Sequence, residues 1–110
     1  MSNEEINRKI AVIFATDLVG YSKHMEKDEN ATLLGLRECN KIIEVIIKKQ
    51  KGRIFNTGGD SVFAEFPSAV AAVDTAAEFQ KQIKTRNDKD TTVVKLEYRI
   101  GVNMGDVVKE

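Results

Sequence analysis

Two different spacings of apolar residues mark the strands and helices expected in this chain. Residues 10–14 are continuously apolar and the run ends at Thr16, which is typical of a strand buried on both faces. Apolar and polar residues alternate from Val94 to Met104, which is typical of a strand with one buried face. The sequence therefore predicts strands over residues 8–16, 53–57, 61–66 and 94–104.

Turn-forming residues separate these strands. The sequence Gly-Gly-Asp at residues 58–60 predicts a tight hairpin with positive φ at the glycines. Residues 105–106 predict a turn after the last strand, so that residues 107–108 would open a further element. Residues 1–7 are expected to form a loose tail.

Helical patterns fill the remaining segments. They predict helices over residues 21–27, from a cap at Asn30 to about residue 51, and from a cap at Ser68 to about residue 86. The buried face of the first long helix is expected to comprise Leu36, Cys39, Ile43, Ile46 and Ile47. Its second apolar face, which is either buried against the sheet or in contact with another subunit, comprises Leu34, Ile42 and Val45. The buried face of the last helix is expected to comprise Ala69, Ala72, Val73, Ala76, Phe79 and Ile83.

The order of these elements predicts the fold class. Strand, helices, strand, hairpin, strand, helix and strand form an α+β fold with a ferredoxin-like βαββαβ core, in which an antiparallel sheet carries its helices on one face. We expect residues 1–110 to form a single domain.

Composition limits the possible functions. The chain has 17 basic and 17 acidic residues, so no net charge attracts it to nucleic acid or to a membrane surface. The single cysteine, Cys39, excludes an internal disulfide and fits a reducing, cytoplasmic compartment. No apolar run reaches the roughly 18 residues that a membrane span requires.

Two aspartates are expected to meet at one rim of the sheet. Asp17 follows the first strand and Asp60 precedes the third, and these strands are antiparallel neighbours in a ferredoxin-like sheet. Adjacent carboxylates cost free energy unless a cation neutralises them, and carboxylate oxygens beside a glycine turn suit Mg²⁺ bound together with phosphates. The alternatives are that Asp17 caps the next helix and that Asp60 is only a turn residue.

Three blocks of sequence carry a family resemblance. F-A-T-D-L-V-G-Y-S, G-R-I-F-N-T-G-G-D-S-V-F-A-E-F-P-S-A-V-A-A-V and Y-R-I-G-V-N-M-G-D-V-V together resemble the catalytic domain of bacterial class III adenylate/guanylate cyclases. The resemblance implies that Asp17 and Asp60 hold two Mg²⁺ or Mn²⁺ ions, joined by the backbone carbonyl of Leu18. It also implies that a ribose 3′-oxygen attacks the α-phosphorus of a nucleoside triphosphate, giving a cyclic nucleotide and pyrophosphate.

The same resemblance assigns residues to the nucleotide. It implies that phosphates are held by the turn Val19, Gly20, Tyr21 and Ser22. It further implies that Arg99, which opens the R-I-G-V sequence, contacts the triphosphate.

The chain departs from the family pattern in two respects. Asn56 stands where the family often has a purine-reading lysine, so base preference is open, with ATP favoured over GTP. The family domain continues beyond the position of Glu110, with the second purine-reading residue and the groups that stabilise the transition state. We therefore expect the N-terminal part of a cyclase domain, inactive alone and associating as a homodimer through unpaired strand edges and apolar surface around residues 107–108.

Other interpretations stay open. The Gly-Gly-Asp hairpin also resembles that of diguanylate cyclases, although Ser61 and Val62 replace the expected Glu-Phe. The domain could instead be a degenerate, non-catalytic module that binds nucleotide or a partner, as Asn56 favours, or a purely structural ferredoxin-like domain.

Overall fold

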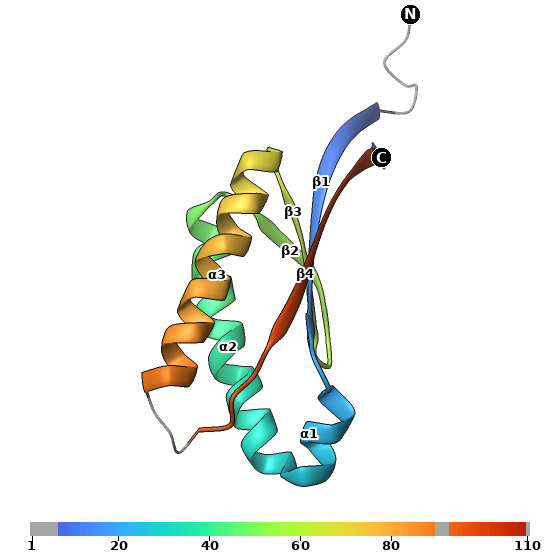
Figure 1. The fold of residues 1–110 in the computed structure, drawn as a ribbon. Coiled ribbons are helices and arrows are strands. Elements are labelled where there is room, and N and C mark those ends of the chain that lie inside the picture. Colours follow the sequence, from blue (N-terminus) through green and yellow to red (C-terminus); the bar gives the residue numbers. More distant parts are fainter. Residues whose placement is uncertain (1–6, 90–92, 110) are drawn as a thin grey trace, which may run out of the picture.

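The computed structural model describes residues 7–89 and 93–109, with side chains described within 11–89 and 93–105. Its elements follow one another as β1 (Asn7–Leu18), α1 (Tyr21–Lys27), α2 (Glu29–Lys49), β2 (Arg53–Gly58), β3 (Ser61–Phe66), α3 (Ala69–Lys89) and β4 (Tyr98–Lys109). The strands form one sheet in the order β2-β3-β1-β4, and all neighbouring strands are antiparallel. Figure 1 shows α2 and α3 together on one face of this sheet. The predicted ferredoxin-like α+β fold is confirmed.

The central strands alternate between the two faces of the sheet. Phe14 and Thr16 of β1 and Ala64 of β3 are fully or almost fully buried beneath the helices. The opposite face, on which no helix of the described chain packs, is called here the open face. Ile13 and Ala15 of β1 point to it and are only half-buried, so the prediction of burial on both faces is wrong for these two residues.

Apolar side chains from both layers fill the space between helices and sheet. Phe14 and Phe66 pack edge to face with their ring centroids 5.5 Å apart, and Phe79 of α3 packs in the same way on Tyr98 of β4 at 5.1 Å. All five residues predicted for the buried face of the first long helix are 5% exposed or less. The second face of that helix is mostly exposed: Leu34 and Val45 are 64% and 67% exposed, whereas Ile42 is partly buried against the core.

Helix α2 begins earlier than predicted. Asp28, not Asn30, is the N-cap residue, and its carboxylate accepts a hydrogen bond from the Ala31 N–H at 3.0 Å. Asp28 is an equally good cap and comes first in the chain, and the Thr32 hydroxyl reinforces this junction by donating to the Asp28 carbonyl at 2.8 Å. The helix ends at Lys49, two residues before the predicted end.

Helix α3 buries the predicted face except at Val73, and it buries Thr75 in addition. Val73 is 55% exposed, whereas Thr75 is completely buried and its hydroxyl donates to the Ala71 carbonyl at 2.8 Å. Positions 72, 75, 79 and 83 lie in one line on a helix, and position 73 lies about 100° away from them. Val73 was predicted to be buried because it is apolar, but its angular position around the helix axis places it at the surface.

The longest strands, β1 and β4, pair along their entire length. The ladder runs from Asn7 opposite Lys109 to Leu18 opposite Tyr98, and it passes residues 105–106 without a turn. The predicted turn there is therefore wrong, because pairing with β1 supplies partners to both backbones. Residues 107–108 belong to the same strand; the apolar surface expected of their side chains lies outside the described side chains. Asn7 lies in β1, and residues 1–6 of the expected tail are outside the described residues.

Strand β4 also begins later than predicted. Residues 94–97 are extended but pair with no described strand. Their backbone is held by side chains of α3: Asn87 donates to the Leu96 carbonyl at 2.8 Å, and Arg86 donates to the Val94 carbonyl at 2.9 Å. These bonds replace the ladder that the alternating pattern predicted.

A membrane span is not found among the described helices, since none is both long enough and apolar enough to cross a bilayer.

Candidate functional site

The pairing of β1 with both of its neighbours positions Asp17. This residue is the penultimate one of β1, not the first after it as predicted, and it lies opposite Ser61 of β3 and opposite Arg99 of β4. Residues directly opposite in antiparallel strands point to the same face, so all three side chains share the open face. Asp17 points away from the core because its neighbours Thr16 and Leu18 take the two buried positions.

A two-residue hairpin turn positions Asp60. Gly58 pairs with Ser61, so that the turn consists of Gly59 and Asp60 alone. Gly59 adopts φ +55°, a left-handed conformation that glycine adopts without the usual cost, whereas Gly58 stays outside this region, contrary to the prediction for both glycines. The turn sets Asp60 immediately before the residue that faces Asp17.

The two carboxylates lie at the same rim of the sheet, because Asp17 is opposite Ser61 and Asp60 directly precedes Ser61. Asp17 has its pKa lowered below the ordinary value of 3.8, first by a hydrogen bond from Arg99 and second by a side-chain hydrogen bond with Asp60, while slight burial opposes the shift. Two carboxyl groups make a hydrogen bond only with a proton between them, and a cation can take the place of that proton. We refer to Asp17 and Asp60 as the acid pair.

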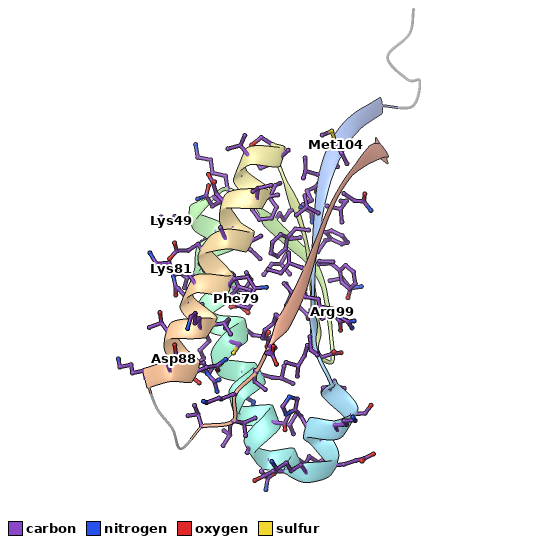
Figure 2. All side chains as sticks on the ribbon, in the orientation of Figure 1. Lys49, Phe79, Lys81, Asp88, Arg99 and Met104 are labelled. Atoms are coloured by element: carbon purple, nitrogen blue, oxygen red, sulfur yellow. The ribbon has the colours of Figure 1, made fainter. Side chains whose placement is uncertain are left out.

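Arg99 already places a positive charge at the acid pair. Its guanidinium nitrogen Nη2 donates to Oδ2 of Asp17 at 2.5 Å. The side chains of Arg99 and Asp17 are 71% and 45% exposed, so this ion pair lies at the surface. Figure 2 shows Arg99 on the side of β4 away from α2 and α3, whereas Phe79 points from α3 toward the sheet.

The predicted phosphate-binding turn connects β1 to α1. Leu18 closes β1 with its side chain buried, and Val19 and Gly20 form the turn. Gly20 adopts φ +68° and is the N-cap residue of α1, in which Tyr21 and Ser22 are the first two residues. The Val19 N–H donates to the Glu97 carbonyl at 2.8 Å, which ties this turn to the segment that leads into β4.

Asn56 belongs to the same surface as the acid pair. It lies opposite Phe63 of β3, which in turn lies opposite Ala15 of β1. Ala15 is two residues before Asp17 in β1, and side chains two residues apart in a strand point to the same face. Asn56 is therefore on the open face, where it is exposed. A bulge at Phe55 precedes it and sets this register.

The donor set of the site suits a hard cation. Carboxylate oxygens and backbone carbonyls are the ligands that Mg²⁺ and Mn²⁺ prefer, and Mg²⁺ usually takes one or two carboxylates together with water and substrate phosphates. Within the part of the chain that the structure describes, no group of three or more His, Cys, Asp or Glu side chains could hold a metal. Two carboxylates would leave the remaining coordination positions of such an ion to water or to another bound ligand.

Sequence reasoning missed one relation within the site. The strand ends predict that Asp17 and Asp60 lie at one rim, but they give no reason for Arg99 to contact Asp17. The sequence signal for this contact is that Asp17 and Arg99 each lie one residue inside a strand end. An antiparallel ladder that pairs Leu18 with Tyr98 must also pair Asp17 with Arg99.

Comparison with known proteins identifies relatives of this chain. No family model matches it. It is 40% identical over its full length to "Putative adenylate cyclase 3" of Rhizobium meliloti (strain 1021), and it spans only 19% of that protein. The crystal structure of an adenylate/guanylate cyclase/hydrolase from Silicibacter pomeroyi matches 96% of the chain with a TM-score of 0.82 and 34% identity; the chain covers 62% of it.

A further solved structure agrees with these two. The adenylyl cyclase CyaB from P. aeruginosa matches 94% of the chain with a TM-score of 0.80 and 26% identity, and 60% of its length is covered. The chain therefore spans less than two thirds of the relatives described. By sequence and by fold together, this chain is similar to bacterial adenylate/guanylate cyclase domains, over part of the length of such a domain.

Proposed function

We propose that this chain provides the metal-binding half of a nucleotide cyclase site that converts a nucleoside triphosphate to its 3′,5′-cyclic monophosphate and pyrophosphate. The observation that carries the proposal is that strand pairing brings Asp17 and Asp60 to one rim of the sheet, with the cationic Arg99 hydrogen-bonded to the Asp17 carboxylate. The relationship to cyclase domains supports the reaction class.

The acid pair is the proposed metal site. Asp17, Asp60 and the backbone carbonyl of Leu18 would hold two Mg²⁺ or Mn²⁺ ions. Such ions, when bound, lower the pKa of a coordinated hydroxyl and offset the charge of a triphosphate during in-line displacement. The chain's own contribution is to hold two carboxylates on one rigid rim, Asp17 by pairing with two strands and Asp60 by a two-residue turn.

The remaining site residues are proposed to bind the nucleotide. Arg99 presents a planar fork of donors that matches phosphate oxygens. Further phosphate contacts would be made by the turn Val19 and Gly20 after β1 and by Tyr21 and Ser22 at the start of α1.

Asn56 is proposed to contact the base. It lies one row from Asp17 on the open face, and its amide can both donate and accept hydrogen bonds at a purine edge. An asparagine lacks the charge and the reach of lysine, and we favour ATP over GTP as substrate.

The chain supplies half of the chemistry in this proposal. Its relatives are longer, and we propose that the groups that stabilise the transition state come from outside these 110 residues and that two copies associate through their open faces. Phe55 is 47% exposed, and its ring centroid lies 6.3 Å from that of Phe63 on the open face. These two rings would give such an interface apolar surface area.

Product analysis tests the proposed function. The 110-residue chain is incubated with ATP or GTP and Mn²⁺, and cyclic nucleotide and bound nucleotide are both measured. We expect metal-dependent binding without turnover, and turnover when the same residues stand in a domain of the length of the solved relatives. Absence of both metal-dependent binding and turnover in the longer domain would contradict the proposal.

A second function is favoured by one residue. Because Asn56 stands where the family often has a purine-reading lysine, the domain could bind nucleotide without turning it over, as a regulatory module. Metal-dependent nucleotide binding by a longer domain that forms no cyclic product would identify this alternative.

A further inference from the structure

We propose that Arg99 is the internal counter-ion of the acid pair and competes with the metal for Asp17, so that metal binding releases Arg99 to the substrate phosphates. This inference rests on the proposed function. It makes Arg99 a coupling residue between two ligands and adds to its proposed phosphate contact.

Competition follows from the position of the contact. The Arg99 guanidinium donates to Oδ2 of Asp17 at 2.5 Å, and the hairpin turn places Asp60 at the same rim as this Asp17 carboxyl group. A cation that binds between Asp17 and Asp60 therefore approaches a carboxylate that already carries a positive partner. Two cations close to one carboxylate repel each other, so the metal and the guanidinium cannot both keep their full contact with it.

The exposure of the pair makes exchange possible. Ion pairs between solvent-exposed side chains contribute little to stability, and here the two side chains are 71% and 45% exposed. A metal ion coordinated by both carboxylates can thus displace the guanidinium at small cost. The expected effect of the competition on metal affinity is accordingly modest, about two- to fivefold.

The sheet determines where the released side chain goes. The backbone of Arg99 stays paired with Asp17 in the β1–β4 ladder, so the guanidinium remains on the open face within reach of the acid pair. A fork of N–H donors beside a bound metal is suited to the oxygens of a phosphate group that the same metal holds. Metal and triphosphate then favour each other's binding, and this coupling is reciprocal.

Opposite effects of one substitution test the coupling. Mn²⁺ affinity is measured without nucleotide for the wild type and for Arg99→Ala, and the affinity for ATP is then measured at saturating Mn²⁺. We expect Arg99→Ala to bind Mn²⁺ about two- to fivefold more tightly and to bind ATP more weakly. The matched control is Arg53→Ala, which removes a similar ion pair to Glu65 elsewhere on the open face and should change neither affinity.

Nuclear magnetic resonance supplies a readout independent of affinity. The side-chain Nε–Hε signal of Arg99 should shift when Mg²⁺ is added without nucleotide, while that of Arg53 should not. The proposed coupling is wrong if wild type and Arg99→Ala bind Mn²⁺ with equal affinity, or if the Arg99 signal does not shift when Mg²⁺ is added. Neither result would contradict metal binding by the acid pair. Absence of Mn²⁺ binding in both proteins, with and without ATP, would overturn the proposed function as well.

Discussion

Asp17 and Arg99 face each other across the β1–β4 pair, and their side chains form an ion pair of 2.5 Å on the open face. This relation brings a cation to a carboxylate at the rim where the hairpin turn places Asp60, so three charged groups meet at one rim of the sheet. The proposed metal site depends on the charges of Asp17, Asp60 and Arg99.

The pKa of Asp17 should depend on its ion pair with Arg99. Because Arg99 lowers the pKa of Asp17 below 3.8 in the folded state, the ionised acid is favoured by folding. The resulting stabilisation is present above pH 3.8 and is lost as the pH falls through the folded-state pKa. Arg99→Ala should raise the pKa of Asp17, measured by carboxyl-carbon NMR titration, whereas Arg53→Ala should leave it unchanged. An unchanged titration in Arg99→Ala would show that this ion pair does not form in solution.

The hairpin turn should tolerate a side chain at one glycine and not at the other. Gly59 has φ +55°, so Gly59→Ala should lower the free energy of unfolding by about 1–2 kcal/mol. Gly58 is outside the left-handed region, and no atom within 4 Å would meet a Cβ there, so Gly58→Ala should cost less. Urea unfolding of the two variants makes the comparison. Equal losses would mean that the turn conformation is different from the one described.

The core face of α3 can be tested with a buried and an exposed position. Phe79 is 1% exposed and packs on Tyr98, so Phe79→Ala should destabilise the fold by about 3–5 kcal/mol. Val73 is 55% exposed, and Val73→Ala should change the free energy of unfolding by no more than about 0.5 kcal/mol. A loss at Val73 comparable with that at Phe79 would restore the face predicted from the sequence.

The thiol of Cys39 should be unreactive toward soluble reagents in the folded protein. The residue is fully buried, and burial is the main cause that raises the pKa of its thiol above 9.0. Since the thiolate is the reactive form, a soluble disulfide reagent at pH 8 should modify Cys39 only after denaturant is added. Rapid modification of the native protein would show that the layer between α2 and the sheet opens readily.

Periodicity predicted most of this fold because the buried faces are strongly apolar. The continuous run in β1 and the spacing of Leu36, Cys39 and Ile43 in α2 identify elements that no alternative structure would bury as well. The order of these elements then leads to the sheet topology, and the topology brings Asp17 near Asp60.

The errors arose where backbone pairing or helical angle outweighs residue preference. Residues 105–106 have turn preferences, yet the ladder with β1 keeps them in a strand. Thr75 is polar, yet its hydroxyl is satisfied by the Ala71 carbonyl, so it can take the buried position that was assigned to Val73. The Asp17–Arg99 pair required the exact register of two strands, which strand boundaries uncertain by a residue or two cannot give.

The most direct test of the account is whether the acid pair binds metal together with a nucleoside triphosphate. Binding of a fluorescent ATP analogue is followed by polarisation with Mn²⁺ and with a chelator, for the wild type, Asp17→Asn, Asp60→Asn and the control Asp74→Asn on the exposed surface of α3. Circular dichroism confirms that each variant is folded. We predict Mn²⁺-dependent binding to the wild type and to Asp74→Asn, and its loss in both acid-pair variants. Binding that persists in Asp17→Asn and Asp60→Asn, or that is the same with chelator as with Mn²⁺, would contradict the central claim.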